Sequence, residues 1–421
     1  MTEDVERQLT KRNTQRTPES STKKKRACKL AGGGFTAEAE ILTTTGLTTV
    51  TDLSTGQKVY ALDPISRIIK PKPVTAVRTV PFDGQLITIE ARRVDIQVAP
   101  DHRIPYRTKS DSRIRFKRAG NLKQKSYYKF INSWQSLPRK RLETVDITDF
   151  LDEYEICVSY DGHGHTFRAA LPDGCEPIRN NGHTGYHFDA QTFKEHQSVI
   201  EALADEITIR SGPNHHRRPY RFDGDDFIQF LGWFITEGSV YWSSSSDTAQ
   251  VKIAQENERH RQSIASLFER MQLDFHSNDR RFEMGSKVFG RLLENHCGAG
   301  SHNKHLPAFV WNLSQKQQRL LLEVLIAGDG NDRQTYYTAS ERLANDILQL
   351  CLELGIKPRY TVRKGIWQIY VREVNDGFQS AVHLGREEAT QDLYRLTVED
   401  YNVVMAGRNG KFQWVGVSNV A

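Results

Sequence analysis

The chain has 421 residues, with 58 Lys and Arg against 52 Asp and Glu, and its mean hydropathy is -0.60. This length predicts two or three domains, and no apolar run approaches the roughly 20 residues that a membrane-spanning helix needs. The first 30 residues are polar and basic, without an apolar signal core, so we expect a cytoplasmic protein. Five scattered cysteines argue against a secreted disulfide scaffold.

Short β-like runs dominate both ends of the chain. Residues 1–33 are basic and nearly free of large apolar side chains, which predicts a disordered tail. Between residues 34 and 156, runs of β-branched and aromatic residues alternate with turn signals such as Asp83-Gly84, which predicts an all-β segment. A second β-like stretch at residues 389–421 suggests that both ends contribute to one discontinuous domain.

A helical region with an internal repeat is expected at residues 217–388, after a linker or insertion at residues 157–216. Apolar residues recur at i, i+3, i+4 and i+7 from Ile264, and a shift of 83 residues gives the same register from Ile347. A strand-like run precedes each of these helices. Upstream of each strand lies another apolar helix that ends in an acid and a glycine.

These acid-glycine endings are Glu237-Gly238 and Asp329-Gly330. Small residues near both ends would allow close helix packing, which would bring the two carboxylates together. Each carboxylate also faces the negative end of its helix dipole, at a cost of about 0.3–1 kcal/mol. A cation relieves both costs, and oxygen ligands with open positions suit Mg²⁺. The alternative is that each acid merely precedes a surface glycine that caps its helix.

Residues 230–238 (FLGWFITEG) and 322–330 (LEVLIAGDG) resemble the two motif copies of the LAGLIDADG homing endonucleases. The resemblance covers roughly residues 217–374. It implies an α+β fold of two α-β-β-α-β-β-α halves, with the motif helices at the interface of the halves. It also implies that Glu237 and Asp329 bind Mg²⁺ and activate water at the two scissile phosphates of double-stranded DNA. Because both motifs lie in one chain, we expect a monomer.

Two further catalytic candidates follow from the same resemblance. Gln255 matches the strand position where the family often places a polar residue that holds the water network, although a solvent-facing strand residue explains it equally well. Lys304 resembles the basic residue between the motifs that supports the transition-state charge, and its alternative is a surface lysine. The equivalent in the second half is either Lys357 or Lys364.

A basic stripe lies between Arg103 and Lys129, where ten Lys or Arg face a single acid, Asp111, and aromatic residues are interleaved. Such a face can track phosphates, so we expect it to contact DNA. The alternative is a β-edge protected by charge. The expected DNA-binding residues are Arg103, Arg107, Arg113, Arg115, Lys117, Arg118, Lys123 and Lys125.

The β segments resemble a Hint (intein) domain. Its sequence blocks are matched by residues 35–46, 56–64, 98–102 and 394–418. Splicing needs a thiol or hydroxyl at the first residue of the domain, where Gly34 stands, and the terminal asparagine that cyclises would fall at Val417. His102 is retained as a remnant of the histidine block. We therefore expect a degenerate Hint scaffold that has lost splicing.

The sequence thus predicts a Mg²⁺-dependent, site-specific DNA endonuclease of the LAGLIDADG type, inserted in an all-β Hint-like domain. No phosphate-cradling glycine motif appears, so no nucleotide cofactor is expected. Two alternatives remain open, namely a self-splicing intein and a catalytically silent DNA-binding protein. A zinc site of Cys157, His163, His165 and Cys175 is disfavoured because it lacks a CxxC pair.

Overall fold

The computed structural model describes residues 33–108, 112–181, 185–210, 217–245, 248–372 and 377–417. The disordered-tail prediction and Ser418 therefore lie outside the described residues, as do Lys109 and Asp111 of the basic stripe. Among the described residues, no helix combines the length and apolarity that crossing a membrane requires.

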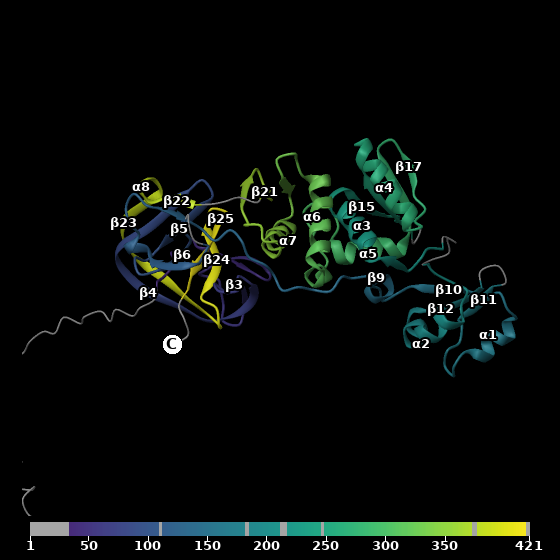
Figure 1. Ribbon diagram of the computed structural model, residues 1–421. Coiled ribbons are helices and arrows are strands. Elements are labelled where there is room, and N and C mark those ends of the chain that lie inside the picture. The colour runs from purple at the N-terminus through teal and green to yellow at the C-terminus, as the bar shows by residue number, and fades with distance from the viewer. Residues whose placement is uncertain are drawn as a thin grey trace, which may run out of the picture. The chain divides into compact units, whose positions relative to one another are not determined.

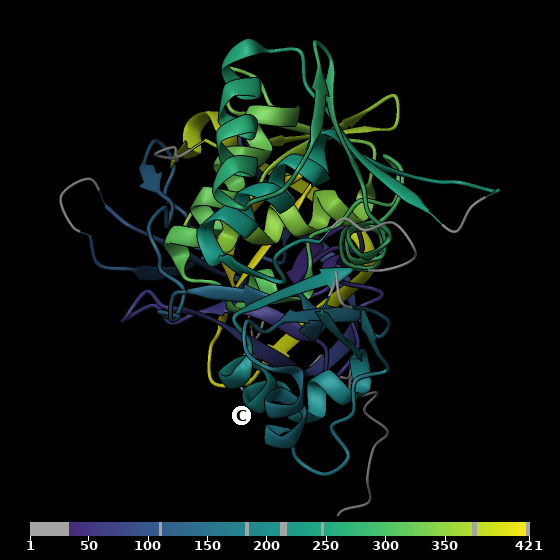
Figure 2. The same cartoon turned by 90° about the vertical axis from the view of Figure 1, so that its right-hand side faces the viewer.

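The largest sheet combines strands from both ends of the chain. Its main path runs β2-β1-β24-β3-β4-β23, with β25 paired to β24 and β5 paired to β4. Figures 1 and 2 show the yellow C-terminal strands beside the purple N-terminal ones. The strands are β1 (Glu40–Thr43), β2 (Gly46–Thr49), β3 (Lys58–Leu62), β4 (Ile69–Ala91), β5 (Val94–Val98), β23 (Leu384–Val398), β24 (Val403–Arg408) and β25 (Lys411–Gly416).

The short strands of this sheet are buried almost throughout, as in β3, β24 and β25, so apolar side chains on both of their faces contribute to the core. Ile41, Val59 and Val404 are fully buried in one core cluster. β23 pairs with β4 along its whole length, so the expected boundary at residue 389 falls inside a strand. Smaller pairs flank the sheet, namely β6 (Arg103–Tyr106) with β7 (Arg115–Arg118), and β8 (Tyr127–Lys129) with β22 (Gly377–Gln379), which leads into α8 (Ser380–His383).

The segment expected to be a linker or insertion is folded. Its strands form a four-stranded sheet in the order β11-β12-β10-β13, and the expected boundary at residue 156 falls within β10. A short pair, β9 with β14, leads from this region to the helical repeat. The elements are β9 (Thr144–Asp146), β10 (Glu155–Ser159), α1 (Gly164–Ala170), β11 (Arg179–Asn181), β12 (Gly185–Asp189), α2 (Ala190–Leu203), β13 (Glu206–Arg210) and β14 (Arg221–Asp223).

The first half of the helical repeat has the order α-β-β-α-β-β-α, and its strands form a sheet in the order β15-β16-β18-β17. Its elements are α3 (Gly224–Glu237), β15 (Gly238–Trp242), β16 (Ala249–Ala254), α4 (Glu258–Arg270), β17 (His276–Asn278), β18 (Arg281–Gly285) and α5 (Lys287–Cys297).

The second half is shorter in the described residues. It consists of α6 (Gln315–Asp329), β19 (Thr335–Thr338), α7 (Glu341–Glu353), β20 (Tyr360–Arg363) and β21 (Ile366–Tyr370). The offset of 83 residues reproduces the second helix of the repeat, because α7 begins and ends 83 residues after α4. Here the structure differs from the expected two equal halves, because only an isolated bridge, Gly330 to Tyr336, stands where the first half has β15.

Helices α3 and α6 pack directly against each other (Figure 1). A methyl group added at Gly232 on α3 would lie 2.7 Å from Cγ1 of Val324 on α6, and one added at Gly328 would lie 2.6 Å from Cβ of Thr236. Each glycine thus makes room for a branched side chain of the opposite helix. Gly232 thereby accommodates the bulk of Val324, and close packing is preserved.

Local sequence explains why these two helices begin where they do. Asp223, rather than Asp225 or Asp226, caps α3 by accepting hydrogen bonds from the backbone N–H groups of Asp225 and Asp226. Ser314 caps α6 as its position suggests. The apolar residues of α3 are buried all round the helix, which is the pattern of a helix in the centre of a core.

The substitution Gly328→Ala tests this packing. The new methyl group would meet Thr236, whose Cβ cannot move without its backbone, so we expect a loss of about 1–3 kcal/mol in the free energy of unfolding. Denaturant unfolding of the full chain measures the loss. Gly285→Ala is the control, because a methyl group there meets nothing within 4 Å. Equal stability of both variants would contradict the close approach.

Candidate active site

Glu237 and Asp329 are the last residues of α3 and α6, so the packed helices bring their C-terminal ends together. The glycine after each acid has an extended backbone, with φ of -92° at Gly238 and -104° at Gly330. Neither glycine is therefore a left-handed helix cap. Each is needed because a side chain would collide with the preceding turn, at Phe234 in one helix and Ile326 in the other.

The electrostatic environment of the two carboxylates favours their neutral forms in the absence of a cation. Burial and, to a smaller extent, the charge of Glu237 raise the pKa of Asp329 to about 7, against the opposing charge of Lys304. Burial also raises the pKa of Glu237, which a hydrogen bond from Gln255 partly offsets. Two half-buried acids beside each other at helix C-termini are costly to ionise.

Gln255 is brought to the site from the residue after β16. Its Nε2 donates to Oε1 of Glu237 at 3.3 Å, while its own Oε1 accepts from the backbone N–H of Asn257 at 2.8 Å. The side chain is therefore fixed by the turn and positions the carboxylate. Its counterpart in the 83-residue register, Thr338, instead accepts from the backbone N–H of Ser340 and caps the local turn.

Lys304 is buried rather than exposed on a polar loop. Its Nζ donates to the carbonyl oxygen of Phe234 at 2.9 Å and lies 3.6 Å from the centre of the Phe234 ring. Burial lowers its pKa to about 8, with Asp329 acting in the opposite direction. The ammonium group thus stands at the negative end of the α3 dipole, on the side of the site where the carboxylates gather.

The sequence interpretation missed Tyr336 on β19. Its side chain is fully buried, and its hydroxyl has no hydrogen-bond partner among the described residues. Burial raises its pKa well above the ordinary value, and the charges of Asp329 and Glu237 act in the same direction. The signal available in the sequence was its place two residues before Thr338, on the same face of the strand.

The donor set fits a hard divalent cation. Glu237 and Asp329 offer carboxylate oxygens, and the buried Tyr336 hydroxyl has no hydrogen-bond partner among the described residues. Metals that prefer soft ligands would instead select the sulfur atoms of cysteine or methionine. The residues are therefore suited to Mg²⁺, which Glu237 and Asp329 could hold.

Neither lysine suggested for the second half joins this site. Lys357 is buried elsewhere and donates to the backbone carbonyl of Arg93 at 3.2 Å. Lys364 lies exposed in the turn between β20 and β21, with a positive φ of 51°. Among the described residues, Lys304 is the lysine whose charge acts on Asp329.

Most of the basic stripe is exposed, but one of its arginines makes hydrogen bonds within the domain. β6 and β7 are antiparallel, which places Arg103 opposite Arg118, both exposed. Arg107 instead donates to the carbonyl of Phe130 and to Asn132, so it holds the domain together. The remaining members are exposed or half-buried, and they are Arg113, Arg115, Lys117, Lys123 and Lys125.

His102 lies in the β-rich domain, where the N-terminal and C-terminal segments of the chain meet. Its ring is fully buried, and its pKa is lowered to about 4 by that burial against the opposing effect of the Gly34 and Gly416 backbones. The N-terminal and C-terminal segments of the domain thus converge on one histidine. No thiol or hydroxyl is contributed by Gly34 or Val417.

The disfavoured zinc set is not assembled. Cys157 instead lies 3.4 Å from Nδ1 of His187, and Glu155 completes a group whose donor atoms lie within 4.8 Å of one another. Arg179 and Arg210 are ion-paired with Glu155. These two positive charges oppose the binding of a cation at this group.

No family model matches the chain. It is 27% identical over 214 residues to a DNA polymerase of Thermococcus hydrothermalis, covering 47% of this chain and 12% of the polymerase. It is 22% identical over 353 residues to an ATP-dependent Clp protease proteolytic subunit of Chlamydomonas moewusii, covering 76% of this chain and 28% of that protein. The chain therefore spans a small part of these curated relatives.

Solved structures with partial similarity include intein-like domains and a homing endonuclease. A bacterial intein-like domain from Clostridium thermocellum is 27% identical, with a TM-score of 0.20, over 24% of this chain and 66% of that domain. The homing endonuclease I-WcaI, solved bound to its DNA recognition sequence, is 12% identical, with a TM-score of 0.25, over 35% of this chain and 76% of that one. These TM-scores lie below the range that indicates a shared overall fold.

The raised pKa of Asp329 predicts a pH-dependent stability. In metal-free protein, a folded pKa of about 7 against an ordinary 3.8 means that the folded state favours the protonated acid. The stabilisation that protonated Asp329 gives to the folded state is complete below pH 3.8 and is lost as the pH rises through 7. Asp329→Asn, which cannot ionise, should therefore gain stability relative to wild type between pH 5 and pH 8.

Urea unfolding in EDTA at both pH values measures this difference. Glu323→Gln, which removes an exposed acid from the same helix, is the matched control and should show a smaller change. A difference between Asp329→Asn and wild type that stays constant with pH would contradict the burial of this carboxylate.

Proposed function

We propose that the chain is a Mg²⁺-dependent, site-specific double-strand DNA endonuclease of the LAGLIDADG type, carried by a Hint-like scaffold that does not splice. The observation that carries the proposal is the pairing of Glu237 and Asp329 at the ends of two helices in van der Waals contact. Two ionised carboxylates at such a place need a cation, and a nuclease site supplies a use for it.

The chemistry divides among the residues as follows. Mg²⁺, when bound, supplies charge stabilisation at a phosphate and lowers the pKa of bound water. Glu237 and Asp329 hold the cation, and Gln255 fixes the orientation of the Glu237 carboxylate through its hydrogen bond. Lys304 adds a positive charge that acts on Asp329, and this charge can also oppose the negative charge that develops at a phosphate.

The likenesses described above agree with this proposal. A homing endonuclease and intein-like domains are among the similar structures, and the endonuclease was solved with DNA. The polymerase match covers 12% of that protein, which is what a segment inserted in a larger protein would give. The monomeric state is proposed because both carboxylates come from one chain.

Incubation of the purified chain with a mixed DNA library, with Mg²⁺ or with EDTA, tests the nuclease directly. Sequencing of the new ends should find recurrent, Mg²⁺-dependent cuts. The Glu237→Gln, Asp329→Asn double variant should lose at least about 100-fold in cleavage rate, because even groups around a metal ligand contribute 10- to 100-fold. Glu323→Gln should cut like wild type. Site-specific binding without any cut would instead support a silent DNA-binding protein.

The Hint-like scaffold makes a separate prediction. Gly34 and Val417 provide no nucleophile and no cyclising amide at the two ends that meet near His102. Expression of the chain between two foreign flanking domains should therefore give the unspliced fusion alone, as seen by gel and mass spectrometry. A shortened product in which the flanks are joined would establish the self-splicing alternative.

A further inference from the structure

The segment that carries Lys304 follows α5 in the chain, and its ammonium group reaches the carbonyl oxygen of Phe234, three residues before Glu237. A lysine side chain has several rotatable bonds, so it keeps such a position only if its backbone is also held. The position of this charge at the candidate site therefore depends on what holds residues 304–306.

The C-terminal end of α5 provides the first anchor. The backbone N–H of His305 donates to the carbonyl oxygen of Cys297, the last residue of α5, at 3.0 Å. Gly298 follows with a positive φ of 80°, and a methyl group there would lie 2.0 Å from the carbonyl oxygen of Asn303. The loop between these residues is therefore closed tightly at its base.

Helix α7 provides two further anchors. Oγ of Ser340, the N-cap residue, donates to the carbonyl oxygen of Lys304 at 2.7 Å and accepts from the backbone N–H of Leu343. Oδ2 of Asp346 accepts from the backbone N–H of Leu306 at 2.8 Å. Ser340 also begins the helix, whereas Asp346 lies inside the helix and its carboxylate has no part in the cap.

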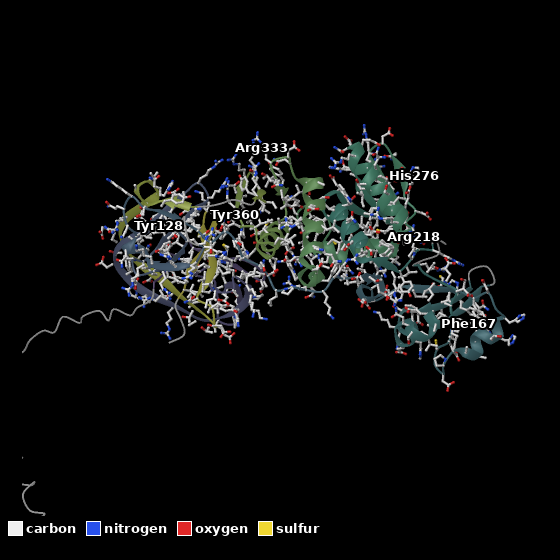
Figure 3. The ribbon with its side chains drawn as sticks, viewed as in Figure 1. Tyr128, Phe167, Arg218, His276, Arg333 and Tyr360 are labelled. Carbon is white, nitrogen blue, oxygen red and sulfur yellow. The ribbon has the colours of Figure 1, made fainter. Side chains whose placement is uncertain are left out.

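Helix α7 is itself held by the β-rich domain. The carboxylate of Glu353, the last residue of α7, accepts from the hydroxyl of Tyr60 on β3 at 3.1 Å. Tyr360, labelled in Figure 3, adds a second contact between the nuclease-like region and this domain, since its hydroxyl donates to Glu40 on β1. The helix is therefore a fixed support for the segment that carries the lysine.

Asp346 is unfavourably placed for an acid. Burial raises its pKa to about 6, and the hydrogen bond from Leu306 and the charge of Arg342 oppose this shift. An apolar side chain would occupy the same helix position without the cost of desolvating a carboxylate. The hydrogen bond to Leu306 is the interaction that accounts for an acid at this position.

We propose that Asp346 is a positioning residue for the nuclease site, because it holds the backbone beside Lys304 and so keeps the ammonium group at the C-terminal end of α3. A displacement of about 1 Å at a reacting centre can lower a rate by about 100-fold. As a contribution to cleavage the proposal rests on the proposed function, whereas the positioning of Lys304 can be measured without cleavage.

Two substitutions separate the hydrogen bond of Asp346 from its charge. Asp346→Asn removes the charge and keeps an oxygen that can accept from Leu306, whereas Asp346→Ala removes the acceptor. Glu341→Gln, an exposed acid in the first turn of α7, is the matched control for loss of a carboxylate. Melting temperatures establish that each variant is folded at the assay temperature.

The first measurement is the rate at which an acylating reagent modifies the amine of Lys304, followed by mass spectrometry. Lys304 is 5% exposed, so it should react slowly in wild type, in Asp346→Asn and in Glu341→Gln. In Asp346→Ala it should react several-fold faster. Lys357, which is also buried, reports general opening of the fold and should stay slow throughout. Faster reaction at both lysines, or at neither, would overturn the proposal.

The second measurement is single-turnover DNA cleavage in a double-mutant cycle with Lys304→Met. Asp346→Ala alone should lower the cleavage rate about 10- to 100-fold, with little change in the Kd for DNA in Ca²⁺, and Asp346→Asn should retain most of the rate. In the Lys304→Met background, Asp346→Ala should lower the rate further by less than about 2-fold, because the lysine through which it acts is absent.

Equal losses in both backgrounds would refute a role of Asp346 that acts through Lys304. Absence of cleavage by wild type would instead refute the proposed function, and the reactivity of Lys304 would still decide whether Asp346 positions it.

Discussion

The close contact between α3 and α6 is the constraint on which the candidate site depends. Because Gly232 faces Val324 and Gly328 faces Thr236, the two backbones approach until branched side chains fill the space left by glycine. This approach brings Glu237 and Asp329 together and removes much of their solvent. The same geometry that is favourable for packing is therefore unfavourable for two ionised acids, and the imbalance is what makes the site suited to a cation.

The fold of the β-rich domain does not depend on the residues that splicing chemistry requires. Its core is made by apolar side chains of strands from both ends of the chain, and β24 is held between β1 and β3 by backbone pairing. None of these interactions needs a nucleophile at Gly34. The convergence of the chain on His102 therefore requires no thiol or hydroxyl at either end of the domain.

The sequence by itself determined the local features of this protein. The helical periodicity that recurs at an offset of 83 residues and the acid-glycine endings both depend on residues a few positions apart, and the structure has each of them. Tertiary structure decided what depends on distant residues. Tyr336 came near the site because β19 packs against α6, whereas Lys357 instead contacts the turn between β4 and β5. The folded sheet around β10 was also missed, although β10 and β13 carry strand-like apolar residues, because its pairing joins short strands that lie far apart in the sequence. Periodicity reports which face of an element is apolar, but only the folded chain fixes which faces meet.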